Sequence, residues 1–292
     1  MRSEEIRIRD PFILPVGGTY YLYGTTDRNC WSGPAEGFLA YSGTDLVHWD
    51  GPYPVFRPPA GFWANENFWA PEVHVYNGRF FMFASFFRQG RPRATQILVS
   101  GSPLGPFLPL ADGPVTPPDW ECLDGTLHVE GGTPYLVFSH EWTQVRDGEI
   151  HAMALTPDLT RAASEPVLLF RASEAPWTSP QNWNDKTAYG DYVTDGPFLY
   201  RTREGSLLMT WSSLSSTGYA VGIARSVSGS ILGPWVQQEE PLFRQDGGHG
   251  MVFQTTDDRL FMALHQPNGP PGEERPKFFE LVENRGSLEV RP

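Results

Sequence analysis

The sequence predicts an all-β fold, a five-bladed β-propeller with four-stranded antiparallel blades around a central channel. The first observation is a fivefold repetition along the 292 residues, in which an apolar strand opens after a polar residue and returns through a Gly, Asn or Asp turn into a second strand. The second is a pervasive alternation of apolar and polar residues, with no apolar stripe of helical period. Repetition of this kind is typical of a radial array of small sheets that bury their faces against one another.

Each unit supplies four strands in two pairs. The inner pairs are expected at residues 10–26, 70–86, 123–140, 194–213 and 248–266. The outer pairs, each a strand, a Gly, Ser or Pro turn and another strand, are expected at residues 37–56, 94–110, 149–170, 219–243 and 277–292. Three of the outer pairs contain a Gly-Pro-aromatic corner, which we interpret as structural: Gly51-Pro52-Tyr53, Gly105-Pro106-Phe107 and Gly233-Pro234-Trp235. A longer insert at residues 172–193 is expected to wall a pocket.

Composition indicates one globular domain over residues 1–292, because all-β folds commonly reach this length as a single unit. A formal charge of −12 argues against nucleic acid and anionic membranes as partners, and there is no apolar run long enough to span a membrane. The two cysteines, Cys30 and Cys122, are expected to be reduced thiols. The first residues lack the apolar core of a secretory signal, so a cytoplasmic location is expected if this is the native start. Oligomeric state is left open.

In a five-bladed propeller, five equivalent residues, one from each blade, are expected to form a ring around the central channel. Taking Asp10, Glu72, Asp124, Asp195 and His249 as equivalent, the steps along the chain are 62, 52, 71 and 54 residues. The innermost strands begin beside the channel, so these side chains converge. Like charges brought together raise one another's pKa, and such an arrangement often marks a chemical site.

The second strand of each unit returns to the same end of the channel. The residues expected there include Phe86, His140 with Glu141 and Trp142, Ser212 and His265. Hydroxyls, imidazoles and aromatic faces together suit a sugar, whose hydroxyls form hydrogen bonds and whose C–H face stacks on an aromatic ring. Substrate contacts are therefore expected from these residues and from Trp69. Glu72 and Arg275 could bind substrate or hold the backbone, and the sequence leaves both readings open.

Five motifs in this order resemble glycoside hydrolase family 43, over essentially the whole chain. They are Arg9-Asp10-Pro11, Trp69-Ala70-Pro71-Glu72, Leu123-Asp124-Gly125, Thr194-Asp195-Gly196-Pro197 and Gly248-His249-Gly250. The resemblance implies a five-bladed propeller that hydrolyses arabinosides or xylosides with inversion, acting as an α-L-arabinofuranosidase or β-xylosidase, and we expect exo action on short oligosaccharides.

The resemblance also implies roles. Asp10 would be the general base, Asp124 the carboxylate that tunes and orients the acid, and the position of Asp195 that of the general acid. Most members have Glu there, and Asp is one methylene shorter, so Glu141 is a rival for the acid. His249 resembles a channel histidine that lies near a calcium ion or water in several members. No cofactor is expected to be required, and the resemblance allows for a structural calcium ion in the channel.

Two other classes stay open. A propeller could bind carbohydrate, or be a degenerate enzyme, without hydrolysing it. A retaining enzyme related to levansucrase or invertase is a weaker alternative, because its nucleophile and partner motifs do not occur where that family has them.

Overall fold

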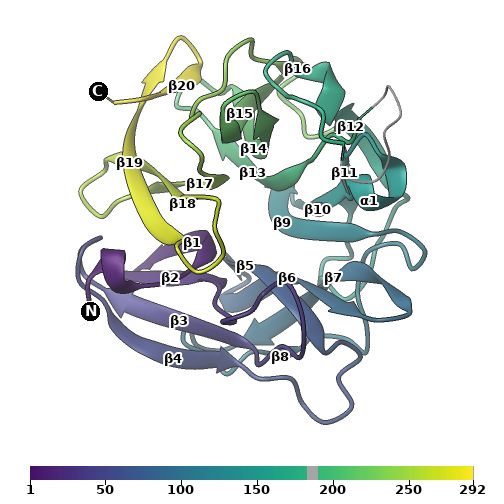
Figure 1. Ribbon diagram of the computed structural model, residues 1–292, viewed down its shortest axis with the longest axis vertical. Helices are drawn as coiled ribbons and strands as arrows, with labels where there is room; N and C mark the ends of the chain where they lie inside the picture. The colour runs from purple at the N-terminus through teal and green to yellow at the C-terminus, as the bar shows by residue number, and fades with distance from the viewer. Residues whose placement is uncertain (183–189, 292) are drawn as a thin grey trace.

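Twenty strands form five antiparallel sheets, each built from four strands consecutive in the chain (Figure 1). The structure is a computed structural model, and it describes residues 1–182 and 190–291. Blade 1 contains β1 (Arg9–Val16), β2 (Thr19–Thr25), β3 (Phe38–Gly43) and β4 (Asp50–Phe56). Blade 2 contains β5 (Glu66–Tyr76), β6 (Arg79–Arg88), β7 (Arg91–Ser100) and β8 (Leu108–Pro109). Blade 3 contains β9 (Cys122–Glu130), β10 (Thr133–His140), β11 (Glu149–Ala154) and β12 (Val167–Arg171).

The last two blades repeat this order. Blade 4 contains β13 (Asp195–Arg201), β14 (Leu207–Ser215), β15 (Gly218–Ser226) and β16 (Trp235–Gln237). Blade 5 contains β17 (Gly248–Gln254), β18 (Leu260–Gln266), β19 (Arg275–Asn284) and β20 (Ser287–Val290). Helical structure in the described residues is limited to η1 (Ser3–Glu5), α1 (Trp142–Val145) and η2 (Ala172–Glu174). The predicted five-bladed β-propeller is confirmed.

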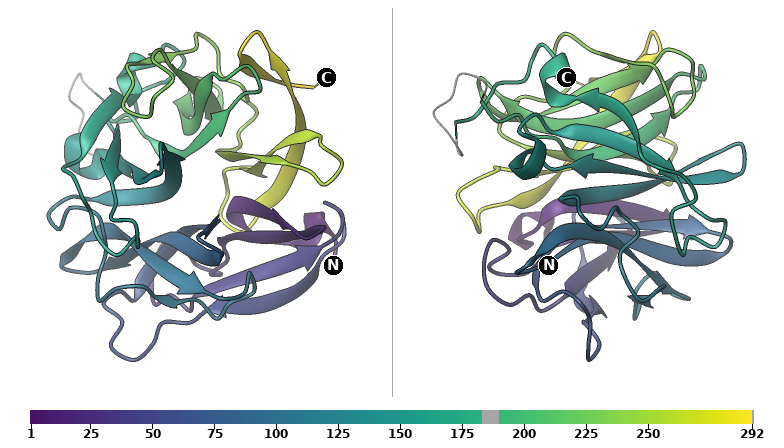
Figure 2. Two further views of the ribbon diagram at one scale, coloured as in Figure 1. Left: turned by 180° about the vertical axis from the view of Figure 1, so that it is seen from behind. Right: turned by 90° about the vertical axis from the view of Figure 1, so that its right-hand side faces the viewer.

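The blades stand in a ring, with blade 5 beside blade 1 (Figures 1 and 2). Alternate residues of each strand face opposite sides of a sheet, so each blade offers apolar side chains to both neighbours. Four apolar clusters fill the spaces between blades, and the largest buried side chains include Trp211, Tyr23 and Phe38. Two of the Gly-Pro-aromatic corners bury their rings, Phe107 and Trp235, and the ring of the third, Tyr53, is partly buried. Cys30 and Cys122 are free thiols.

Every innermost strand carries a β-bulge near its start. The register with the second strand shifts after Arg9, Trp69, Leu123, Asp195 and Gly248. The residue that follows has a positive φ in all five blades: Asp10 at 52°, Ala70 at 46°, Asp124 at 56°, Gly196 at 49° and His249 at 54°. A bulge re-aims one side chain and is common beside functional sites. The propeller therefore presents one such residue per blade to the channel.

These bulges correct the expected alignment of the repeats. Asp10, Asp124 and His249 are equivalent, but the blade 2 counterpart is Ala70 and not Glu72, and the blade 4 counterpart is Gly196 and not Asp195. Asp195 instead matches Arg9, one residue before the bulge. Motif letters alone could not show this shift, because the bulge is a property of backbone conformation.

Candidate active site

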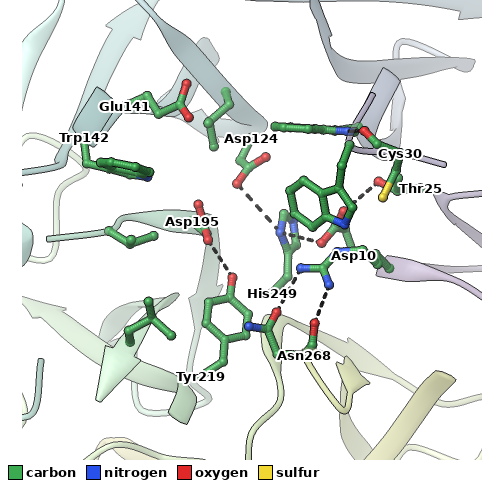
Figure 3. A pocket seen from close by; sticks show the side chains of 16 residues that line it. Asp10, Thr25, Cys30, Asp124, Glu141, Trp142, Asp195, Tyr219, His249 and Asn268 are labelled. Atoms are coloured by element: carbon green, nitrogen blue, oxygen red, sulfur yellow. Dashed lines mark hydrogen bonds and ion pairs between the residues drawn. The ribbon is translucent and has the colours of Figure 1, made fainter. Parts of the chain in front are cut away.

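A cavity of about 240 Å³ opens at the end of the channel where the innermost strands begin (Figure 3). Asp10, Asp124, Asp195 and Glu141 line it together with His249. Its aromatic lining consists of Trp31, Trp69, Trp142 and Tyr219. The predicted convergence of carboxylates from blades 1, 3 and 4 on one pocket is therefore present in the structure.

A second ring of side chains holds the bulges in place. Thr25, Ser85, Ser139, Ser212 and His265 are equivalent residues on the second strand of each blade. Four of them accept a hydrogen bond from the bulge N–H of the next blade: Ala70 to Thr25 at 2.8 Å, Asp124 to Ser85 at 2.9 Å, His249 to Ser212 at 2.8 Å and Asp10 to His265 Nδ1 at 3.1 Å. Three of these N–H groups are buried and that of Asp10 is partly buried, so the bonds satisfy groups that would otherwise be costly to leave unpaired.

Blade 4 is the exception to this pattern. The N–H of Gly196 donates to the Asp124 carboxylate at 2.9 Å, and the buried hydroxyl of Ser139 has no hydrogen-bond partner. Asp124 therefore takes the place of the hydroxyl, and one of its oxygens is fixed beside the backbone that carries Asp195.

Asp10 is held as a carboxylate. The Thr25 hydroxyl donates to its Oδ2 at 2.6 Å, and His249 Nδ1 lies 3.3 Å from its Oδ1. Burial by itself would raise the pKa of this carboxyl, but His249, Arg9 and the Thr25 hydroxyl hold it below the ordinary value. An ionised carboxylate at this position can accept a proton from water.

His265 supports Asp10 from beneath as a neutral ring. Its Nδ1 accepts the Asp10 N–H, while its Nε2 lies 3.3 Å from Asn268 Oδ1, an acceptor. Burial, aided by the charge of Arg9, lowers the pKa of His265 to about 3. The ring is completely buried, so the expected substrate contact is corrected to a backbone contact. Ser212 is corrected in the same way, because its buried hydroxyl accepts the His249 N–H.

Asp124 and Asp195 are both in surroundings that favour the protonated form. Burial and then the charge of Asp10 raise the pKa of Asp124 well above its ordinary value. Burial and then Asp124 raise the pKa of Asp195 to about 7. The Tyr219 hydroxyl donates to Asp195 Oδ2 at 2.8 Å, and Asp195 is the more exposed of the two carboxyls. In Figure 3 Asp195 and Asp10 lie on either side of His249.

Glu141 occupies the far wall of the pocket, where it precedes α1. Arg93 Nε lies 3.5 Å from its Oε2. Burial raises the pKa of Glu141 in spite of the nearby Arg93 charge. Three carboxyls of the pocket therefore have raised pKa values. Asp124 is held by the Gly196 N–H, so Asp195 and Glu141 remain as candidates for the proton donor.

The sequence analysis missed part of the aromatic wall. Trp31 lies 5.3 Å from Trp69 in an edge-to-face arrangement, and it is 48% exposed. Arg9 lies over Trp31 at 4.8 Å, and Arg93 lies over Trp69 at 3.8 Å. Exposed tryptophan faces beside a polar pocket are suited to stacking on sugar rings. Trp31 stands in a loop between two predicted strands, and periodicity carries no information about such a position.

The side-chain positions correct the expected substrate contacts of Phe86 and His140, and they favour the structural readings of Glu72 and Arg275. Phe86 is completely buried among Phe38, Phe56 and Phe68. Its neighbour Ser85 holds the channel position, because successive strand residues face opposite sides.

His140, Glu72 and Arg275 also lie outside the pocket lining. His140 stacks on Trp120 at 4.2 Å, and Glu72 pairs with His74 at 3.0 Å. The Arg275 guanidinium donates to three backbone carbonyls and pins the N-terminal segment.

The insert at residues 172–193 contributes Val193 to the pocket. Trp177 instead packs on Trp211 at 4.8 Å in the core between blades 3 and 4. Trp183 and Tyr189 of this insert lie outside the described residues. In the part of the chain that the structure describes, no helix is long and apolar enough to cross a membrane.

Comparison with known proteins identifies the family. The model of glycosyl hydrolases family 43 matches residues 5–281, and the chain therefore belongs to this family. A crystal structure titled endo-arabinase from Bacteroides thetaiotaomicron superposes with a TM-score of 0.90 at 40% identity, covering 98% of each chain. A thermostable family 43 glycoside hydrolase superposes at 0.80 with 26% identity, covering 98% of this chain and 93% of the other.

Two curated relatives are more distant. The α-L-arabinofuranosidase 43 of Humicola insolens is 24% identical over 60% of this chain and 36% of its own length. The extracellular endo-α-(1→5)-L-arabinanase 1 of Bacillus subtilis is 22% identical over 56% of each. The matched region thus spans about a third to just over half of these relatives.

Proposed function

We propose that the protein is an inverting glycosidase that hydrolyses α-L-arabinofuranosyl linkages. The observation that carries this proposal is that one pocket holds two carboxyls in opposite surroundings. The Thr25 hydroxyl at 2.6 Å and His249 at 3.3 Å lower the pKa of Asp10, whereas burial and then Asp124 raise the pKa of Asp195 to about 7. Inverting glycosidases need such a pair, one carboxylate to activate water and one acid to protonate the leaving oxygen.

In this mechanism Asp10 accepts a proton from a water molecule as the water oxygen bonds to the anomeric carbon. The glycosidic C–O bond breaks on the opposite face, and Asp195 gives its proton to the departing oxygen. The pair must leave room for the water, with carboxyls roughly 6.5–9.5 Å apart. Burial, together with the close approach of the second carboxyl of Asp124, keeps a proton on the acid, and Asp124 steadies the adjacent backbone by accepting the Gly196 N–H.

The choice of arabinose rests on the relatives. The solved structure at 40% identity is named an endo-arabinase, and the two curated relatives are named an α-L-arabinofuranosidase and an endo-α-(1→5)-L-arabinanase. Xylosides are the second candidate class of substrate, because the family resemblance includes enzymes that hydrolyse them. The aromatic wall of Trp31, Trp69 and Trp142 supports a sugar substrate of either kind.

The test is a screen of the purified protein on 4-nitrophenyl α-L-arabinofuranoside, β-D-xyloside and β-D-galactoside and on linear α-1,5-arabino-oligosaccharides. Turnover of the arabinose substrates with initial release of the inverted β-anomer, followed by NMR, is expected. Arabinose as the first product would indicate exo cleavage, and di- and trisaccharides endo cleavage. Retention of configuration would refute the pairing of Asp10 with Asp195.

A carbohydrate-binding propeller without hydrolysis is the second candidate. One observation favours it: Asp195 stands where most family members have the longer Glu, and a misplaced acid can cost on the order of 100-fold in rate. Binding of arabino-oligosaccharides without any turnover in the same screen would support this alternative.

A calcium ion at His249 is a separate proposal. His249 turns Nδ1 toward Asp10 and Asp124, at 3.3 and 3.7 Å. An ion there would have the other ring nitrogen as a side-chain ligand and would depend on oxygen ligands from water or the main chain, which calcium prefers. One imidazole nitrogen does not by itself make a calcium site, so such an ion would be held weakly and chiefly through water, and no step of the mechanism above passes through it.

A further inference from the structure

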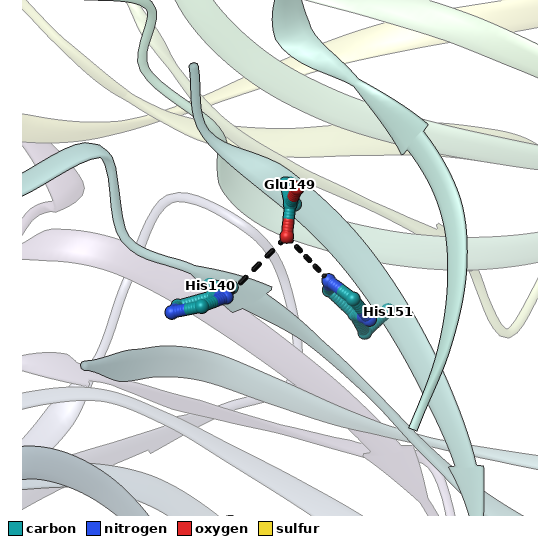
Figure 4. A group of neighbouring side chains, drawn as sticks. All are labelled: His140, Glu149 and His151. Carbon is teal, nitrogen blue, oxygen red and sulfur yellow. Dashed lines mark hydrogen bonds and ion pairs between the residues drawn. The ribbon is translucent and has the colours of Figure 1, made fainter. Parts of the chain in front are cut away.

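Blade 3 carries a cluster of two histidines and a glutamate outside the pocket (Figure 4). His140 ends β10 and pairs directly across the ladder with Glu149 of β11. His151 lies two residues beyond Glu149, so all three side chains face the same side of the sheet. We propose that His140, Glu149 and His151 bind a divalent transition-metal ion, with zinc preferred.

The distances are those of a chelating site. His140 Nδ1 lies 3.4 Å and His151 Nε2 lies 2.8 Å from the same oxygen, Glu149 Oε2, and the three ligand atoms all lie within 4.8 Å of one another. A tetrahedral zinc ion with bonds of about 2.0–2.2 Å separates its ligand atoms by about 3.3–3.5 Å. A small rotation of His151 would therefore admit the ion.

The hydrogen bonds of Gln144 set the tautomer of His140. The Gln144 amide is fixed because its Oε1 accepts the Glu121 N–H at 2.8 Å and its Nε2 donates to the Asp119 carbonyl at 2.9 Å. His140 Nε2 lies 2.7 Å from this same Oε1 and so carries the proton that is donated to it. In the neutral ring Nδ1 is then a bare lone pair.

That lone pair faces a carboxylate. His140 is 6% exposed, and its Nδ1 has no hydrogen-bond partner, although it points at Glu149 Oε2. Two acceptors turned toward each other in a buried place repel. A second proton on His140 would make the contact an ion pair, and a metal ion between the two groups removes the conflict for the neutral ring. Donation of the second ring N–H to a carbonyl is also the usual arrangement of a metal-binding histidine.

Neighbouring side chains hold Glu149 and His140 in place. Arg171 donates to the second carboxylate oxygen, Glu149 Oε1, at 2.8 Å, which leaves Oε2 for the ion. Trp120 stacks on His140 with an angle of 7° between the rings. Two imidazoles and one carboxylate match known zinc sites with a fourth position for water, whereas calcium prefers oxygen ligands.

The ion would act structurally on the pocket. His140 directly precedes Glu141 and Trp142, which line the cavity, while the three ligands do not. A metal that joins β10 to β11 would hold this wall at its base.

The experiment uses the whole protein, stripped with a chelator and dialysed, and titrated with Zn²⁺ and Co²⁺ by calorimetry. One ion per chain is expected, and a hundredfold excess over Kd should raise Tm by about 5 °C. A zinc-bound crystal should show anomalous difference density between the three side chains. Calcium added at equal concentration should not compete.

Variants separate this site from others. Glu149→Gln and His151→Gln should each weaken zinc binding at least about 10-fold, and the matched control His128→Gln, in β9 of the same blade beside Glu130, should bind like the parent. Circular dichroism of the metal-free variants checks folding. Should either variant fail to fold, the anomalous density in the parent decides. Absence of stoichiometric binding, density elsewhere, or unchanged affinity in folded variants would overturn the proposal.

Discussion

The Tyr219 hydroxyl donates a 2.8 Å hydrogen bond to the carboxylate of Asp195, across blade 4 of the propeller. This bond favours the ionised form of Asp195 and so works against burial and Asp124, which raise its pKa. Tyr219 is itself deeply buried, and its own pKa is raised well above the ordinary value by burial and by Asp195, so it remains a donor at neutral pH. The balance of these effects sets the proton occupancy of the proposed acid.

The first prediction concerns the pH dependence of kcat/KM. The acid must be protonated, so activity should fall as pH rises through the Asp195 pKa of about 7. The base must be ionised, and the pKa of Asp10 is lowered, so activity should persist down to below about pH 4. A profile measured on an arabino-oligosaccharide should therefore be broad on the acid side. An acid limb near pH 6 would contradict the assignment of Asp10.

Tyr219→Phe should shift only the alkaline limb of the pH profile of kcat/KM. Removal of the donor raises the pKa of Asp195, so the limb should shift upward by about one pH unit, given the strength of a hydrogen bond to a charged group. Tyr200→Phe is the matched control, because the Tyr200 hydroxyl donates to Glu283 at 2.6 Å outside the pocket. An alkaline limb that stays in place in Tyr219→Phe would indicate that Glu141 is the acid.

Asp195→Ala should be selective for the leaving group. A general acid matters most when the departing alcohol is poor, so activity on a dinitrophenyl arabinoside should largely survive while that on arabino-oligosaccharides falls at least about 100-fold. Glu141→Ala should reduce both alike through binding. The measurement is the rate of each variant on the dinitrophenyl arabinoside divided by its rate on the arabino-oligosaccharide. The opposite pattern, with leaving-group dependence in the Glu141 variant, would exchange the two roles.

Asp10→Asn should separate binding from turnover. The amide keeps the size of the side chain but cannot accept a proton from water, so kcat should fall at least about 100-fold. Binding of arabinotriose, measured by calorimetry, should stay within about threefold of the parent. The Thr25 hydroxyl can still donate to the amide oxygen, so folding should be preserved. Near-normal turnover in folded protein would remove Asp10 from the mechanism.

The sequence was sufficient for the fold and for the meeting of Asp10, Asp124 and Asp195 in one pocket, but it wrongly added Glu72 to this group. Strand periodicity and the fivefold repetition depend on the local order of apolar, polar and turn residues. This order can be followed along the chain, so it predicted the blades. The pairing register between the first and second strand of each blade was harder to predict. The bulges shift it locally, which is why Glu72 was assigned to the position of Ala70 and Phe86 to that of Ser85.

The sequence could not predict contacts between distant loops, because these contacts depend on the tertiary arrangement of the chain and not on local order. Trp31 reaches the pocket through a loop, and Arg9 binds Asn268, which lies 259 residues away in the chain. The cross-strand pairing of His140 with Glu149 similarly depends on the length of the β10 to β11 connection. The cytoplasmic location, the roles of the site residues and the metal content stay predictions.

The last prediction tests the ring of hydroxyls beneath the site through stability. Ser85 and Ser139 are equivalent residues, both completely buried, but only Ser85 accepts a bulge N–H, that of Asp124. Ser85→Ala would leave this N–H unsatisfied, so the free energy of unfolding should fall by about 1–3 kcal/mol. Ser139→Ala removes a hydroxyl that has no partner, so it should cost less than about 1 kcal/mol or stabilise the protein. Urea denaturation of both variants measures the difference. Equal losses would mean that the bulge N–H of Asp124 does not depend on Ser85, and that the interlock between neighbouring blades rests on side-chain packing alone.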